Sequence, residues 1–312
     1  MHTRIPNTVV AIMGPTASGK TDLALALARE WPVTVISVDS ALVYRGMDIG
    51  TAKPSCDVLT QVPHRLIDIR DPTESYSAAD FARDAVREIA AAQAAQRLPL
   101  LVGGTMLYFR ALREGLSDLP QADPVVRAAL DDEMRRHGSA TLHARLAQVD
   151  PVAAQKIHPN DPQRIQRALE VYLLTGRPWS ELCREREATT PFPLTSFIVA
   201  PADRAVLHQR IARRFDIMIE EGLIDEVRAL RARGDLQLSL PSMRAVGYCQ
   251  VWQYLDGDFD FPNMREQAVA ATRQLAKRQL TWLRRDWGAT WIDTEDDDPL
   301  TRILKNLVSG LT

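Results

Sequence analysis

The sequence predicts an α/β fold in which helices flank a parallel sheet and an all-helical insertion interrupts the chain. Three observations lead to this prediction. Short apolar runs alternate with helical patterns over the first third of the chain, which is typical of parallel sheets. A glycine-rich loop at 14–21 joins the first apolar run to a helical pattern. From about 120 to 186 only helical patterns occur.

Apolar runs predict the strands. Four are expected in the first third of the chain and a fifth near 198, namely 8–13, 33–38, 65–69, 99–102 and 197–199. A segment rich in Leu and Ala, 22–29, predicts the helix after the first strand. A second helix is predicted at 77–96, because Ser77 and Asp80 have the spacing of a capping box.

The insertion is expected to form a helical domain over 120–189, with the catalytic core in 1–119 and 190–312. Asp123-Pro124 and Asp161-Pro162 each place a proline at the first helical position, and Gly176 ends the second of these helices. The segment 208–287 again predicts mainly helices, and the acidic cluster 295–298 predicts a solvated loop.

Composition narrows the class of protein. The 312 residues are 46% hydrophobic and 25% charged with a net charge of −2, which indicates a globular chain of one or two domains without an overall basic field. Three distant cysteines without a C-x-x-C pair argue against a disulfide framework and a zinc site. No apolar run approaches the roughly 20 residues of a membrane span, and the N-terminus lacks a signal-peptide core. We therefore expect a cytoplasmic protein with no membrane partner.

The loop at 14–21 carries the strongest chemical signal. It fits G-x-x-x-x-G-K-[ST], the P-loop motif, between a predicted strand and a predicted helix. Backbone N–H groups at the helix N-terminus point at an anion, Lys20 adds a positive charge and the Thr21 hydroxyl can hold Mg²⁺. The loop therefore predicts a P-loop-type sheet and a site for a di- or triphosphate. The residues expected to bind it are Gly14, Pro15, Thr16, Ala17, Ser18, Gly19, Lys20 and Thr21.

Asp39 ends the second predicted strand, at the sheet edge where ligands bind in open α/β sheets. Three interpretations compete for it: a ligand of Mg²⁺, a general base, or a cap of the following turn. Asp68 has the same ambiguity with weaker flanking sequence. After the fourth strand, Gly103 and Gly104 allow close backbone approach, and Thr105 offers a hydroxyl or caps a tight turn.

Basic residues gather in three places: Arg164 with Arg167, the arginines of 210–214, and the segment 264–288. The last segment holds six Lys or Arg against two acidic residues, with two tryptophans interleaved. Basic and aromatic side chains in this combination suit nucleic acid, because cations neutralise phosphates and rings stack on unpaired bases. Charged helix faces are also commonly just solvated and tryptophans are commonly core residues, so composition leaves both interpretations open.

Several blocks together resemble the bacterial tRNA dimethylallyltransferases (tRNA isopentenyltransferases). The resemblance covers about 8–292 and rests on the P-loop and on the blocks 37–54, 63–68, 76–81, 101–108, 158–164 and 271–279. It implies transfer of the dimethylallyl group from dimethylallyl diphosphate to N6 of adenosine 37 in tRNAs that read codons starting with U. In that family the P-loop holds the diphosphate of the donor, although it is often described as ATP-binding.

The resemblance also implies roles for residues. Asp39 accepts the N6 proton, Thr105 orients the diphosphate or the amine, and Lys20, Thr21 with Mg²⁺, and Arg214 stabilise the leaving diphosphate; the roles of Arg210 and Arg213 are not separated from that of Arg214. The positions expected to contact tRNA are Asp39, Ser40, Ala41, Leu42, Thr105, Arg127, Gln163, Arg164, Ile165, Gln166, Arg167, Arg244, Ala245, Val246, Gly247, Tyr248, Cys249, Lys277, Arg278 and Arg284.

The expected partners are the tRNA anticodon stem-loop and dimethylallyl diphosphate, with Mg²⁺ as cofactor, and the expected state is a monomer. Eukaryotic members of the family add a C-terminal zinc finger whose ligands are not found here, so no zinc is expected. Two other classes fit the P-loop core: a kinase that uses ATP with Asp39 as base, and a non-catalytic RNA-binding protein switched by a nucleotide.

Overall fold

The computed structural model describes residues 8–115, 117, 119–184, 192–285, 287–296 and 298–309. The chain divides into two compact units, which we call the sheet unit (Met1–Leu112 and Pro191–Thr312) and the helical unit (Arg113–Thr190). In the part of the chain that the structure describes, none of the helices combines the length and the apolar composition that a bilayer span requires.

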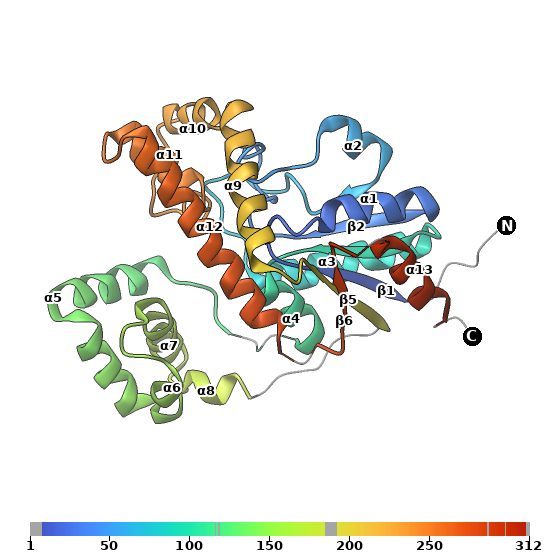
Figure 1. Cartoon of the computed structure of the whole chain (residues 1–312). Helices are drawn as coiled ribbons and strands as arrows, with labels where there is room; N and C mark the ends of the chain where they lie inside the picture. The colour runs from blue at the N-terminus through green and yellow to red at the C-terminus, as the bar shows by residue number, and fades with distance from the viewer. Residues whose placement is uncertain are drawn as a thin grey trace. The chain divides into compact units, whose positions relative to one another are not determined.

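The sheet unit is built on a six-stranded parallel sheet in the order β3-β2-β4-β1-β5-β6. Figure 1 shows helices on both sides of this sheet. Its strands are β1 (Val9–Met13), β2 (Val33–Val38), β3 (His64–Arg65), β4 (Leu98–Gly103), β5 (Leu194–Ala200) and β6 (Thr290–Asp293). Gly103 at the end of β4 pairs with Met13 on one side and with Val38 on the other. The segments that leave β1, β2 and β4 therefore start side by side. The predicted parallel α/β sheet is confirmed.

Helices cover both faces of this sheet because successive strand side chains point to opposite faces. On one face, α1 (Lys20–Glu30) and α13 (Pro299–Ser309) pack on Val10 and Ile12 of β1. The other face holds the larger core cluster, which includes Ala11 and Met13 of β1. Its helices are α3 (Ala78–Ala94), α4 (Met106–Glu114), α9 (Arg204–Glu220), α10 (Leu223–Ala232), α11 (Tyr248–Asp256) and α12 (Phe261–Leu283). A short helix, α2 (Cys56–Gln61), precedes β3.

The helical unit contains α5 (Pro124–Val149), α6 (Pro151–Lys156), α7 (Pro162–Thr175) and α8 (Trp179–Leu182). Asp123 and Asp161 accept hydrogen bonds from backbone N–H groups in the first turns of α5 and α7, and a proline follows each of them. Gly176 ends α7 in the left-handed conformation, with φ 69°. These predicted helix starts and the predicted stop are confirmed, and so is the capping box of Ser77 and Asp80 at the start of α3.

Two strand predictions differ from the structure. The third strand was expected at 65–69, but β3 ends at Arg65, because Leu66 and Asp68 adopt left-handed φ angles of 62° and 57° that a strand cannot contain. The edge strand β6 was not predicted, since only Ile292 of its four residues is buried and no apolar run marks it. Of the acidic cluster, Glu295 and Asp296 lie in an exposed turn, while Asp297 is outside the described residues.

Candidate active site

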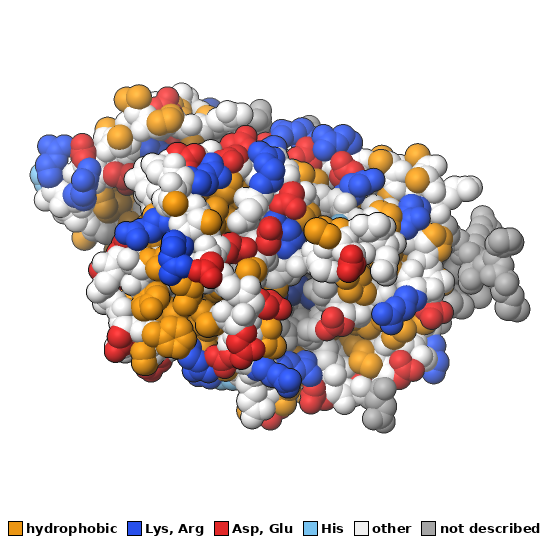
Figure 2. Space-filling model, turned by 90° about the horizontal axis from the view of Figure 1, so that it is seen from above, with side chains coloured by type: hydrophobic (Ala, Val, Ile, Leu, Met, Phe, Trp, Pro, Cys, Tyr) orange, Lys and Arg blue, Asp and Glu red, His pale blue; other side chains and the backbone are white. Residues whose placement is uncertain are grey.

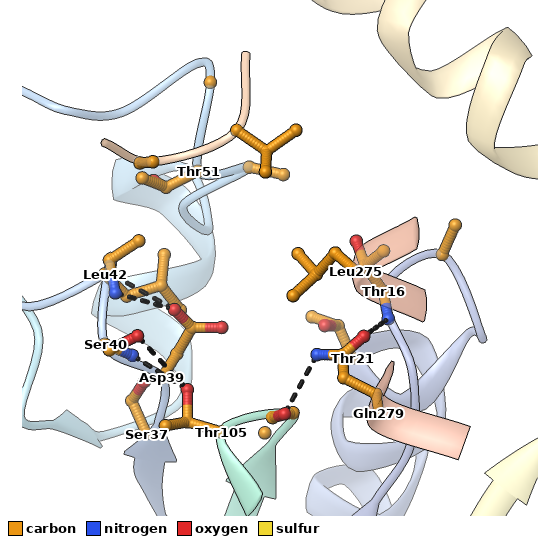
Figure 3. Close-up of a pocket in the computed structure, with 18 of the residues that line it drawn as sticks. Thr16, Thr21, Ser37, Asp39, Ser40, Leu42, Thr51, Thr105, Leu275 and Gln279 are labelled. Carbon is orange, nitrogen blue, oxygen red and sulfur yellow. Dashed lines mark hydrogen bonds between the residues drawn. The ribbon is translucent and has the colours of Figure 1, made fainter. Parts of the chain in front are cut away.

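A cavity of about 590 Å³ opens at the sheet edge where β1, β2 and β4 end, which is the edge where open α/β sheets bind ligands. Its size lies within the usual range for small-molecule sites. The lining residues come from the P-loop, the loop after β2, the turn after β4, and helices α9 and α12, and all of them belong to the sheet unit. Thr16, Thr21 and Gln279 face Asp39, Ser40 and Thr105 across the cavity in Figure 3.

The P-loop presents a positive charge to this cavity. Lys20 is the first residue of α1, and its ammonium donates a hydrogen bond to the carbonyl oxygen of Pro15 at 3.0 Å. Burial and the neighbouring Arg214 guanidinium lower the pKa of Lys20 to about 8, although the Asp39 carboxylate opposes this shift. An anion that binds between these cations would favour the protonated ammonium and so strengthen its own site.

Asp39 has the turn-capping role, one of the three that the sequence left open. Its Oδ1 accepts the N–H of Ala41 at 2.8 Å, which is the turn-capping role. The other carboxylate oxygen points into the cavity in Figure 3, toward the side that carries Thr21. The cap therefore fixes the side chain, and one oxygen is left to act on a ligand.

Thr105 ties the turn after β4 to the loop after β2. Its hydroxyl accepts the N–H of Ser40 at 3.1 Å and donates to the Ser40 hydroxyl at 3.4 Å. Gly103 allows these segments to lie this close, because a Cβ at that position would be only 2.0 Å from the carbonyl oxygen of Val38. In this structure Thr105 is thus a support for the loop that holds Asp39, as well as a residue that lines the cavity.

Gln279 of α12 was missing from the predicted site residues. Its side-chain amide spans the cavity edge: Oε1 accepts the N–H of Thr16 at 2.9 Å, and Nε2 donates to the carbonyl oxygen of Gly104 at 2.9 Å. The amide thereby joins the P-loop to the turn after β4. No local sequence pattern points to this contact, because 263 residues separate Gln279 from Thr16.

The segment 48–50, of which Gly50 lines the cavity, is held by a carboxylate that the sequence analysis also missed. Glu226 of α10 accepts the N–H groups of Asp48 and Ile49 at 2.9 and 2.8 Å, and that of Gly50 at 3.3 Å. The hydroxyl of Tyr248 donates to the same carboxylate at 2.5 Å. Gly50 is required here, because a Cβ would lie 2.5 Å from the Tyr248 ring. We call this arrangement the Glu226 clamp.

Removing the Glu226 clamp is expected to destabilise the fold. Glu226→Ala leaves three backbone N–H groups and the Tyr248 hydroxyl without their acceptor, which should lower the free energy of unfolding by about 2 kcal/mol or more. Asp225→Ala is the matched control, since Asp225 is exposed on the same helix and forms a surface pair with Arg228; a surface pair contributes about 0–1 kcal/mol. Urea denaturation of the ligand-free proteins measures both. Equal losses for the two variants would contradict the structural importance of the clamp.

The structure separates the three arginines of 210–214 on α9. Arg214 lines the cavity, whereas Arg213 is exposed and is not part of the lining. Arg210 points elsewhere, because it donates to the Thr294 hydroxyl at 2.9 Å and pairs with Glu295. Burial lowers the pKa of Arg214, while the charge of Asp39 opposes that shift. Arg214 is therefore the arginine of this group that can meet a ligand.

The positions expected to contact RNA in the sheet unit fall into two groups. Those that line the cavity are Asp39, Ser40, Ala41, Leu42, Thr105, Arg244, Ala245, Val246, Gly247 and Arg278. Tyr248, Cys249, Lys277 and Arg284 are not in the lining. Tyr248 is fully buried and bound to Glu226, so its side chain presents nothing to a macromolecule. Lys277 and Arg284 are exposed.

In the helical unit two of the expected RNA contacts, Arg127 and Arg167, also pair with a carboxylate of the protein itself. Glu170 is fully buried and accepts hydrogen bonds from Arg127 at 2.9 Å and Arg167 at 2.6 Å. Burial would raise the pKa of Glu170, but these two guanidinium groups outweigh it and hold the pKa below its ordinary value. Ile165 is likewise buried in the core of this unit. Arg164 stays exposed and pairs only weakly with Asp161 at 3.4 Å.

The remaining two positions of this group lie on the same helix. Gln163 is exposed, and Gln166 donates to the Asp131 carboxylate at 2.6 Å.

Charges of both signs are mixed over the face of the molecule seen in Figure 2, in agreement with the net charge of −2. Basic residues are concentrated in particular places rather than spread over the surface. Around the cavity it comes from Lys20, Arg214, Arg244 and Arg278. Trp282 of α12 also lines the cavity, and the guanidinium of Arg285 lies 4.4 Å from the centre of its ring.

A P-loop on β1, opposed by a carboxylate and an arginine across one cavity of a parallel sheet, defines a P-loop α/β protein with a cavity whose charges suit a phosphorylated ligand. The chain belongs to the IPP transferase family, whose model matches residues 42–286. It is 61% identical over 304 residues to a tRNA dimethylallyltransferase of Alkalilimnicola ehrlichii, covering 97% of this chain and 96% of that protein.

Solved structures resemble the whole chain as well. The tRNA isopentenylpyrophosphate transferase of Bacillus halodurans is 41% identical, with a TM-score of 0.70 and coverage of 98% of this chain and 96% of that one. The corresponding Staphylococcus epidermidis transferase is 32% identical, with a TM-score of 0.67 and coverage of 97% and 98%. A eukaryotic dimethylallyltransferase acting on tRNA shares the fold, with a TM-score of 0.80 at 24% identity, over 98% of this chain and 80% of that one.

Proposed function

We propose that this protein transfers the dimethylallyl group of dimethylallyl diphosphate to N6 of adenosine 37 in tRNAs that read codons starting with U. The products are N6-isopentenyladenosine and diphosphate. The observation that carries the proposal is the cavity in which Lys20 and Arg214 face Asp39, because it combines an anion site with a proton acceptor. The names of the relatives point to the same reaction.

The geometry assigns each group a task. Lys20, Arg214 and the N–H groups at the start of α1 bind the diphosphate and stabilise its charge as the C–O bond to the allylic carbon breaks. The apolar side chains of Ile211, Phe215 and Met218 lie beside Arg214 on α9 and line the cavity, so they can pack against the five-carbon group. The N6 atom forms the new C–N bond and loses one proton.

Asp39 takes that proton. Its cavity-facing oxygen is the acceptor, while the N–H of Ala41 holds the other oxygen in place. The adenine must leave the anticodon stack to enter a cavity at a sheet edge, as other base-modifying enzymes require. Ser40, Leu42 and Arg244 line the cavity together with Asp39 and can contact the displaced nucleotide.

The residues present fit a Mg²⁺ ion. Thr21 lines the cavity next to Lys20, and a buried hydroxyl without a partner, that of Ser37, lines it too. Among the described residues no three His, Cys, Asp or Glu side chains converge on a metal site; Mg²⁺ commonly binds through few protein oxygens together with substrate phosphates and water. Thr21 would hold the ion, which when bound neutralises negative charge on the diphosphate.

We propose further that the enzyme acts as a cytoplasmic monomer. The cavity is complete within one chain, since all its lining residues belong to one sheet unit. The exposed residues Gln163 and Arg164 of the helical unit remain the proposed RNA contacts there.

Mass spectrometry of nucleosides tests the reaction. Unmodified tRNA is incubated with the protein, Mg²⁺ and dimethylallyl diphosphate, and the digest is searched for an adenosine that has gained one isoprene unit. A tRNA with guanosine at position 37 is the control and should stay unmodified. Absence of the modified adenosine from every tRNA tried would contradict the proposal, and formation of ADP from ATP with a small acceptor would point to a kinase.

Lys277→Gln and Arg278→Gln are each expected to reduce the salt dependence of tRNA binding. Every phosphate contact that is removed should lower the slope of log K against log salt by about 1. Arg302→Gln is the control, because Arg302 is an exposed residue of α13 on the opposite face of the sheet from α12. Filter binding over a salt series measures the slopes. Slopes equal to that of the unmodified protein would remove these two residues from the RNA surface.

A further inference from the structure

We propose that Ser37 belongs to the diphosphate site, where its hydroxyl binds a water molecule of the Mg²⁺ ion that accompanies the diphosphate. This inference rests on the proposed function, because it assumes that the cavity receives a magnesium diphosphate. It adds to the site a residue of β2 that neither the P-loop motif nor the charges around the cavity indicate.

The hydroxyl of Ser37 is buried without a hydrogen-bond partner. The residue is 3% exposed, and among the residues that the structure describes only Ser18 shares this condition. Leaving a buried hydroxyl unsatisfied costs about 1–3 kcal/mol. Ser37 lines the cavity whereas Ser18 does not. A molecule that enters the cavity can therefore supply the missing partner of Ser37.

The other side chains on the same face of β2 as Ser37 are apolar. Val33 and Val35 point to the face of the sheet that packs against Ala24 and Leu27 of α1. Ser37 continues this face, since strand side chains alternate with a period of two. A valine or alanine would complete the apolar pattern, so the serine is an exception that packing does not explain.

The cavity reaches this face of the sheet. Ala24, Val35 and Val102 line it together with Ser37, and Val102 is the residue of β4 that pairs with Ser37. The inner part of the cavity thus lies between the start of α1 and the carboxyl ends of β2 and β4. Thr21 lines it from α1, and Figure 3 shows Ser37 on the opposite side.

The chemistry favours a metal-bound water as the partner. Mg²⁺ gives up its waters reluctantly and keeps several of them when it binds with one or two protein ligands. A serine hydroxyl can both donate to and accept from water. If Thr21 is the protein ligand of the ion, the Ser37 hydroxyl across the cavity would face the water molecules that the ion keeps. Ser37 then orients the ion without being one of its direct ligands.

Calorimetric titration with inorganic diphosphate tests this assignment. For Ser37→Ala we expect the Kd of diphosphate to rise about tenfold in the presence of Mg²⁺, because a hydrogen bond in a charged network is lost. In EDTA, without the metal, the Kd should equal that of the unmodified protein. The melting temperature of the ligand-free variant should be unchanged or higher, since an unsatisfied polar group has been removed.

Ser196→Ala is the matched control, because Ser196 is a buried serine of strand β5 in the same sheet that does not line the cavity. Its affinity for magnesium diphosphate should not change. Unchanged affinity in Ser37→Ala would overturn the inference. If the melting temperature of that variant were also lower, Ser37 would have a packing role. An equal loss with and without Mg²⁺ would show a direct contact to phosphate and contradict the water.

The same titration separates this inference from the proposed function. If the unmodified protein modifies tRNA and binds magnesium diphosphate but Ser37→Ala binds it equally well, only the role of Ser37 is wrong. If the unmodified protein binds no diphosphate, both are wrong.

Discussion

Asp39→Asn is expected to lower the rate of prenyl transfer by about 10²–10⁴ while binding of tRNA and of diphosphate stays within a few fold. The amide keeps the shape of the carboxylate, and its oxygen can still accept the N–H of Ala41, so the loop after β2 should not move. What the variant loses is the ability to take the N6 proton. Single-turnover measurements with labelled donor report the chemical step, and filter binding reports the affinity.

Asp68→Asn is the control for this experiment, because the sequence leaves the same interpretations open for both aspartates. The structure separates them: Asp68 pairs with the ammonium of Lys53 at 2.5 Å and is not part of the cavity lining. Its substitution should change the rate less than tenfold. If Asp39→Asn retained full turnover, Asp39 would not be the base.

Arg214→Gln is expected to reduce turnover by about 10²–10³, the usual effect of removing one group that stabilises charge in the transition state. Its binding of magnesium diphosphate should also weaken. The adjacent Arg213→Gln provides a close control, since Arg213 is one residue away on the same helix but is exposed and outside the cavity lining.

Titration with diphosphate and steady-state kinetics of both variants measure these effects. Glutamine removes the charge and shortens the side chain by the same amount at either position, so a difference between the variants reflects the position of the charge. Equal behaviour of the two variants would remove Arg214 from the diphosphate site.

Most of the fold could be predicted from local sequence. The apolar runs of β1, β2, β4 and β5 and the capping residues Ser77, Asp123 and Asp161 are short-range signals that the structure reproduces. The edge strand β6 could not be predicted in this way, because its stability comes from pairing with β5 and its sequence is only partly apolar.

The residues of the site also divide into those that local sequence marks and those that only long-range contacts reveal. The P-loop and Asp39 could be found because a motif and a strand end mark them, and the structure places both at the cavity. Gln279 and Glu226 could not, since each acts on backbone atoms far away in the sequence, such as the N–H groups of Thr16 and Ile49. The resemblance implies that Arg127 contacts tRNA, and this stays a prediction; local sequence could not show that its guanidinium pairs with the buried carboxylate of Glu170.

The Glu226 clamp has a consequence for how the cavity beside it can vary among related proteins. Glu226 grips main-chain N–H groups, which every amino acid except proline supplies. Thr51, which follows the clamped residues and lines the cavity, can therefore be exchanged for side chains of other shapes, and the contour offered to a ligand can change, while the backbone of 48–50 keeps its path. Glu226 itself cannot be exchanged in this way. It lies on α10, far from 48–50 in the sequence and outside every recognisable motif.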